Sequence, residues 1–261
     1  MFVTTQFAEG AGRLWWLELE EAVAWLDRIS VNVGEETIAA PASTAEEKQA
    51  AFERLYWALR RGPEERLRAT VALLAEAAGV DGARLVRTLC LGWDEIAALA
   101  REPNVTIGAH TLSHPMLAKW PAAVARREMA ESKAGIEERL AVPVRHFAYP
   151  VGDPASAGAR EFALAEEVGF VTSVTTRPGH LFPAHASHLH AAARLGQRAL
   201  SERGGASGDA LRRAVPRLES RPARQRRLER DDFSSSRHPA LSLCFRMILS
   251  ENRFPLFGIM L

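Results

Sequence analysis

The sequence predicts an α/β fold in which parallel strands alternate with helices. Between residues 105 and 175, short apolar segments typical of strands are separated by longer segments with helical periodicity. Parallel neighbours need crossover connections of this kind, in an open sheet or a barrel. The chain has 261 residues, 47% of them hydrophobic, and is therefore long enough to bury a sizeable core.

The N-terminal part is predicted to be mainly helical. Phe2–Thr5 has the pattern of a short buried strand, and Leu17–Ile29 has helix-spaced apolar residues. Val31–Ala40 has the length and the central Gly34 of a small hairpin. Two helices are expected next, Thr44–Leu59 and Pro63–Ala78, the second with proline at its first position and acidic residues in its first turn.

The following segment is the most regular. The expected elements are the helix Trp93–Ala100, the strand Val105–Ala109, the helix Ala122–Leu140, the strand Arg145–Tyr149, the helix Ala157–Val168 and the strand Phe170–Thr175. Because parallel strands end at the same edge, residues that follow different strands are expected to meet there.

The last quarter of the chain differs in composition. From residue 194 onward it has 14 arginines, seven acidic residues and little apolar periodicity, so we expect a solvated, disordered segment. We therefore divide the chain into a domain at 1–190 and a basic tail at 191–261.

Charge and cysteine content exclude several classes. A formal net charge of +1 gives no global field for nucleic acid or an anionic membrane. Cys90 and Cys244 are too few and too distant for a disulfide framework or a metal motif. No apolar run reaches a membrane span, and the first residues lack the pattern of a signal peptide, so the chain as written is expected in the cytoplasm.

Two motifs carry the candidate chemistry. His110 and His114 are four residues apart after a predicted strand, in Ile-Gly-Ala-His-Thr-Leu-Ser-His-Pro, and on a helical turn both imidazoles would reach one divalent ion. Arg145 opens the second motif, Arg-His-Phe-Ala-Tyr-Pro-Val-Gly-Asp, whose turn after Tyr149 would place backbone amides at the same edge. A surface histidine pair and a simple strand with its turn are the alternatives.

Together the two motifs resemble the polysaccharide deacetylase family, the NodB-type carbohydrate esterases. The resemblance runs from Phe2 to about His190 and implies a distorted (β/α)7 barrel, truncated at its N-terminus. It implies a divalent metal, commonly Zn²⁺, held by His110, His114 and an aspartate. It also implies that Arg145 orients the catalytic base and that the backbone amide of Tyr149 contributes to an oxyanion hole.

The resemblance also implies a late histidine as general acid. His190 is the best candidate, with His188 behind it, in a segment that contains four histidines.

The sequence departs from the family pattern at both ends. The paired aspartates of the first family motif have no counterpart in residues 1–193, and the only Asp-Asp pair, Asp231-Asp232, lies in the basic tail. Suitable codons for the residues from Ala191 onward, read one base later, encode the family-like sequence Leu-Pro-Arg-Val-Ser-Val-Asn-Gly. We therefore hypothesise that the tail is translated out of frame, which the gene sequence would test.

The resulting functional hypothesis is a metal-dependent hydrolase that removes acetyl groups from N-acetylated or O-acetylated polysaccharide or amino-sugar oligomers, impaired by the missing aspartates. The alternatives are a non-catalytic saccharide-binding relative and a subunit that needs a strand from a partner. An unrelated α/β domain is the general alternative.

Overall fold

The central element is a five-stranded parallel sheet, as the alternating sequence pattern predicted. The structure is a computed structural model and describes residues 1–178, 186 and 188–194. The strand order is β1-β4-β5-β6-β7. These strands are β1 (Phe2–Val3), β4 (Gly108–Ala109), β5 (His146–Ala148), β6 (Thr172–Pro178) and β7 (Ala192–Arg194). The α/β class with parallel strands is confirmed, and β1 and β7 lie at the two edges of the described sheet.

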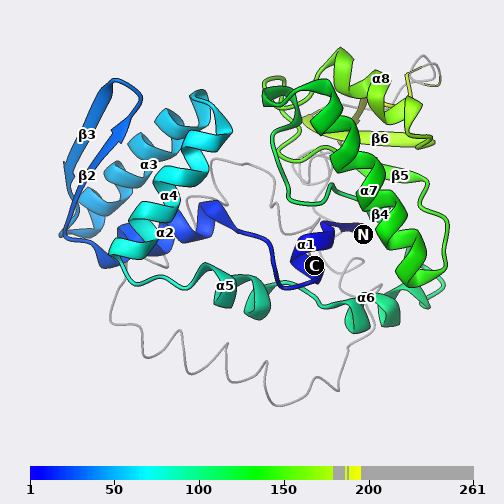
Figure 1. Cartoon of the computed structure of the whole chain (residues 1–261), viewed down its shortest axis with the longest axis horizontal. Helices are drawn as coiled ribbons and strands as arrows, with labels where there is room; N and C mark the ends of the chain where they lie inside the picture. The colour runs from blue at the N-terminus through cyan, green and yellow to red at the C-terminus, as the bar shows by residue number, and fades with distance from the viewer. Residues whose placement is uncertain (179–185, 187, 195–261) are drawn as a thin grey trace, which may run out of the picture.

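Helices cover the sheet to form what we call the sheet unit. Figure 1 shows this unit on the right, with the long α7 in front of the strands. Its core joins residues such as Val3, Ala109 and Phe147 from the strands to Met129 and Ile136 from α7. Its helices are α1 (Thr5–Ala8), α6 (Trp93–Ala100), η1 (Leu117–Lys119), α7 (Ala122–Leu140) and α8 (Ala159–Glu167).

A second body, the helical unit, comprises residues 15–77 and lies on the left of Figure 1. Leu19, Ile38, Leu55 and Leu67 are fully buried in its core, which is separate from that of the sheet unit. Its elements are α2 (Trp15–Trp25), β2 (Arg28–Val33), β3 (Glu36–Pro41), α3 (Ala45–Arg61) and α4 (Glu64–Ala77). The predicted hairpin is present, with Gly34 at φ 73° in its turn.

The C-terminal bound predicted for the helix Leu17–Ile29 is wrong. It was expected to reach Ile29, whereas α2 ends at Trp25 and Ile29 pairs with Ala40 in the hairpin. Apolar spacing alone does not reveal this end, because Ile29 remains buried in either conformation.

The later helices begin where local signals place them. Thr44 caps α3 through a reciprocal capping box with Glu47, and Pro63 precedes α4. The helices at 93–100 and 122–140 have the predicted bounds. A helix that was not predicted, α5 (Gly82–Leu89), begins at the N-cap Asp81.

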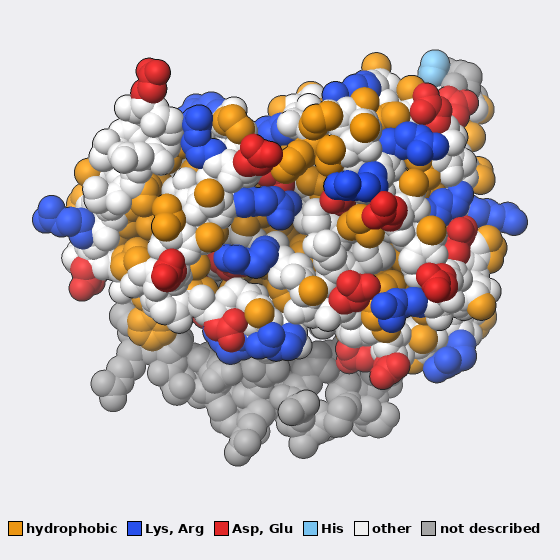
Figure 2. All heavy atoms as spheres, in the orientation of Figure 1, with side chains coloured by type: hydrophobic (Ala, Val, Ile, Leu, Met, Phe, Trp, Pro, Cys, Tyr) orange, Lys and Arg blue, Asp and Glu red, His pale blue; other side chains and the backbone are white. Residues whose placement is uncertain are grey.

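The predicted basic tail, apart from its first residues, lies outside the described residues. No helix within the described part of the chain is long and apolar enough to cross a membrane. On the face shown in Figure 2, basic and acidic side chains are interspersed, so this face has no patch of a single sign.

Candidate functional site

The two motif histidines meet at the end of β4. His110 follows the strand directly, and His114 lies four residues later in a loop. The expected helical turn is absent, because Thr111 and His114 have left-handed backbone, with φ of 67° and 60°. The ring centroids of the two histidines are nevertheless 4.8 Å apart, and both side chains are buried. A reversal of the loop therefore brings the imidazoles together.

The ring of His110 is oriented by the neighbouring strand. Its Nδ1 lies 2.7 Å from the carbonyl oxygen of Ala148, the last residue of β5. A carbonyl only accepts, so Nδ1 carries the proton and donates it. This tautomer leaves the Nε2 lone pair of His110 available for a ligand.

His114 lies among aromatic rings of the N-terminal segment. The ring centroid of Trp16 is 5.0 Å away, and that of Phe7 is 6.0 Å away. Neither ring nitrogen of His114 has a hydrogen-bond partner, although both are buried. A buried imidazole without partners is costly, which indicates that the side chain is suited to a ligand.

Both imidazoles are neutral at pH 7. Burial lowers the pKa of His110 to about 4, and the Ala148 carbonyl opposes this shift only in part. Burial, followed by the charges of His110 and Arg68, lowers the pKa of His114 well below its usual value. The neutral form is the one that binds metal ions.

The loop between the histidines is held by hydrogen bonds from the sheet unit. The carboxylate of Glu128 in α7 accepts from the backbone amides of Leu112 and Ser113, at 2.9 and 3.0 Å, and from the Ser113 hydroxyl. The Thr4 hydroxyl donates to the carbonyl of His110. The Thr111 hydroxyl accepts from the amide of His114.

The helical unit holds the same loop from the other side. Glu64, the first residue of α4, accepts from the amide of Met116 at 2.7 Å, and Arg68 donates to the carbonyl of Ser113 at 3.2 Å. Sequence reasoning missed Glu64, Arg68 and Glu128. Glu64 was noted only as an acidic residue at a helix start, and no sequence signal distinguishes it from its neighbour Glu65.

The other predicted site residues lie at the two ends of β5 and just before β7. Arg145 is exposed and precedes β5, and the register of β4 and β5 places it level with Ile107, three residues before His110. The backbone amide of Tyr149 donates to the carbonyl of Val174 in β6, so the sheet already uses the donor expected to line an oxyanion hole.

The predicted general acid also lies apart from the pair. The side chain of His190 is 3.2 Å from the Ser173 hydroxyl, and its carbonyl accepts from the Tyr149 hydroxyl. His190 precedes β7. In the sheet register, Ala192 of β7 pairs with Val174 of β6, and Val174 pairs with Ala148 of β5. His190 therefore lies toward the other edge of the sheet from His110, and His188 is exposed.

The histidine pair fits part of a metal site. His110 supplies an unprotonated Nε2, and His114 supplies two ring nitrogens without a hydrogen-bond partner. Within residues 1–178, 186 and 188–194, no group of three or more His, Cys, Asp or Glu side chains is arranged to hold a metal. Two of the ligands that the resemblance implied are thus together, and the described residues supply no third ligand to them.

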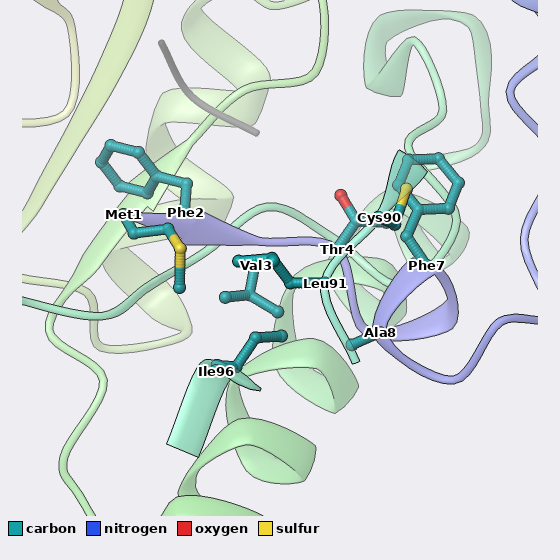
Figure 3. A pocket seen from close by; sticks show the side chains of 9 residues that line it. All are labelled: Met1, Phe2, Val3, Thr4, Phe7, Ala8, Cys90, Leu91 and Ile96. Atoms are coloured by element: carbon teal, nitrogen blue, oxygen red, sulfur yellow. The ribbon is translucent and has the colours of Figure 1, made fainter. Parts of the chain in front are cut away.

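A small pocket lies beside β1 (Figure 3). Its volume is about 30 Å³, which is room for a single water molecule. Its lining is almost wholly apolar and consists of Met1, Phe2, Val3, Thr4, Phe7, Ala8, Cys90, Leu91 and Ile96. The pocket is therefore too small and too apolar for a sugar.

Comparison with known proteins gives one match to a family and several to solved structures. Residues 48–171 match the family described as polysaccharide deacetylase. A Streptococcus pyogenes deacetylase, PplD, solved with acetate, is 23% identical over 40% of this chain and 44% of its own, with a TM-score of 0.36. A polysaccharide deacetylase from Bacillus cereus is 22% identical over 40% of this chain and 32% of its own, also with a TM-score of 0.36.

A third solved structure, the deacetylase domain of BpsB from Bordetella bronchiseptica, is 18% identical over 40% of this chain and 48% of its own, with a TM-score of 0.36. The chain thus spans less than half of each of these three structures. No curated protein matches the chain.

The fold and the histidine pair define an α/β protein with a candidate ligand site at the carboxyl edge of its parallel sheet. Residues 48–171, which include most of α3, all of α4, the histidine loop and β5, match the polysaccharide deacetylase family.

Proposed function

We propose that the chain is a metal-dependent hydrolase that removes acetyl groups from N-acetylated or O-acetylated polysaccharide or amino-sugar oligomers. The observation that carries the proposal is the buried pair His110 and His114: His110 is protonated on Nδ1, which leaves the lone pair on Nε2, and neither ring nitrogen of His114 has a hydrogen-bond partner. The match of residues 48–171 to the polysaccharide deacetylase family supports the reaction class.

His110 and His114 would hold a divalent ion such as Zn²⁺. When bound, such an ion polarises a carbonyl and lowers the pKa of water. The residues of the chain have three other tasks. Ala148 fixes the tautomer of His110, the rings of Phe7 and Trp16 exclude water from His114, and Glu128 holds the loop that joins the two histidines.

Zinc binding tests the proposal most directly. Competition with a chromogenic chelator should give tighter binding to the wild-type chain than to His110→Ala or His114→Ala, by at least about tenfold. His146→Ala is the matched control, because His146 lies in β5 and bonds to Thr172 instead of facing the pair. Equal zinc affinity of the wild type, His110→Ala and His114→Ala would contradict the proposal.

Acetate release from an N-acetylglucosamine oligomer, measured with the same four proteins and added Zn²⁺, tests the reaction. We expect acetate release from the wild type and His146→Ala, and no release from His110→Ala or His114→Ala. The rate also measures the impairment that the sequence led us to expect. Saccharide binding without acetate release would favour the non-catalytic alternative.

A further inference from the structure

Two side chains of α4 reach from the helical unit to the backbone on both sides of His114. Glu64 Oε2 accepts from the amide of Met116, two residues after the histidine, at 2.7 Å. Arg68 Nη2 donates to the carbonyl of Ser113, the residue before it, at 3.2 Å. The loop is thereby held on each side of the residue whose side chain enters the site.

The two α4 side chains also fix each other. Glu64 Oε1 accepts from Nε and Nη2 of Arg68, at 3.0 and 2.7 Å, while Glu64 Oε2 also accepts from Trp120 Nε1 at 3.0 Å. The Glu64 side chain is only 1% exposed. Both carboxylate oxygens are therefore engaged and the rotamer is determined, as a rigid support requires.

The loop needs such support because its backbone is strained. Thr111 and His114 have φ of 67° and 60°, a region that costs side-chain-bearing residues about 1 kcal/mol or more. Residues in this region persist only where the surroundings over-determine them. Glu128 supports Leu112 and Ser113, and the Thr111 hydroxyl accepts from the amide of His114. The Glu64–Arg68 pair adds support from the helical unit at Ser113 and Met116, on both sides of His114.

We propose that Glu64 and Arg68 are positioning residues for His114, and that the helical unit is thereby part of the site. They touch neither imidazole through a hydrogen bond and act through the backbone of the loop. The metal readout below rests on the proposed function. The positioning itself does not, because it concerns the conformation of the chain without metal.

Glu65 provides a matched control. It is adjacent to Glu64 in the first turn of α4, where the helix dipole favours either carboxylate equally, but it is exposed. The variants are therefore Glu64→Gln and Arg68→Met against Glu65→Gln. Arg68→Met retains the apolar stem of a side chain that is 28% exposed, so this variant is expected to fold.

The first readout uses the metal-free chain. Diethylpyrocarbonate modifies accessible imidazoles, and peptide mass spectrometry gives the rates at His114 and His110 separately. We expect the rate at His114 to rise about tenfold in Glu64→Gln and Arg68→Met, because removing charged hydrogen bonds favours local opening of the loop. The rate at His110, which Ala148 and Thr4 hold, should remain unchanged.

The second readout is the Zn²⁺ affinity of the same proteins, which should fall on the order of 10-fold in both test variants and remain unchanged in Glu65→Gln. If the wild type binds no Zn²⁺, the proposed function fails while the modification rates still test the positioning.

Three results would overturn the positioning role. One is an unchanged rate at His114 in both test variants. Another is an equal rise in the modification rates of His110 and His114, which would indicate general loosening of the fold. The third is the same effect in Glu65→Gln as in Glu64→Gln.

Discussion

Gly152 lies in the turn that follows β5, two residues after Pro150, with φ of 68°. A Cβ at this position would lie 2.7 Å from the backbone nitrogen of Thr176 and 3.1 Å from the carbonyl oxygen of Tyr149. We expect Gly152→Ala to lower the free energy of unfolding by about 2–4 kcal/mol, because both neighbours are backbone atoms that cannot move aside.

Gly135→Ala in α7 is the matched control for this substitution, since nothing lies within 4 Å of the added Cβ. In a helix interior it should stabilise the chain by about 0.5–1 kcal/mol. Urea unfolding measures both variants, and a loss at Gly152→Ala no larger than the change at Gly135→Ala would contradict the steric argument.

Glu20 gives the chain a predictable dependence on pH. Burial, reinforced by the charge of Glu21, raises the pKa of Glu20 from 4.5 to about 7. The folded state therefore binds a proton that the unfolded chain releases. The contribution is fully present below about pH 4.5 and is lost as the pH rises through about 7.

We expect the free energy of unfolding to fall between pH 5 and 8 by up to about 3 kcal/mol through this group. Glu20→Gln should remove most of that slope, and the exposed Glu46→Gln should leave it unchanged. Urea unfolding at several pH values measures the slope, and an unaltered slope in Glu20→Gln would refute this assignment.

At the scale of elements, α7 supports the histidine loop through one side chain. Glu128 accepts three hydrogen bonds from Leu112 and Ser113. Glu128→Ala should destabilise the chain by about 2–4 kcal/mol, because two backbone amides lose their partner in a part-buried site. Glu131→Ala, an exposed position on the same helix, should change the stability by less than about 0.5 kcal/mol. Similar losses in the two variants, measured by urea unfolding, would contradict this role.

The elements also show where sequence signals were sufficient. Apolar spacing predicted the bounds of the helices at 93–100 and 122–140, since this signal acts within a few residues. Strand bounds were predicted less well. The strand expected at Val105–Ala109 is reduced to Gly108–Ala109, because pairing with β1 and β5 begins only there.

At the scale of the whole molecule, an ion pair links the helical unit to the turn after β5. Arg60, near the end of α3, donates to Asp153 at 2.7 Å, and its side chain is only 8% exposed. Although burial opposes ionisation, the Ser156 hydroxyl and Arg60 lower the pKa of Asp153. The pair is therefore charged at neutral pH, with the Arg60 side chain buried and the Asp153 side chain 36% exposed.

A double-mutant cycle with Arg60→Met and Asp153→Asn should give a coupling of about 1–3 kcal/mol in urea unfolding. The exposed pair Arg54 and Glu36, which lies within the helical unit, is the control and should give less than about 1 kcal/mol. A coupling across the two units no larger than that of the control would show that this contact does not join them energetically.

The sequence by itself determined the alternation of strands and helices, the bounds of the helices at 93–100 and 122–140, the resemblance to polysaccharide deacetylases and the pair His110 and His114. These properties depend on local periodicity and a short motif, which a single segment contains. The tertiary structure decided which residues meet. It brought the histidines together through left-handed backbone, used the Tyr149 amide in the sheet and left Arg145 exposed.

The tertiary structure also placed Glu64 and Arg68 of one unit against the loop of the other. Such contacts depend on register and on packing between segments about 50 residues apart, and no local pattern encodes them.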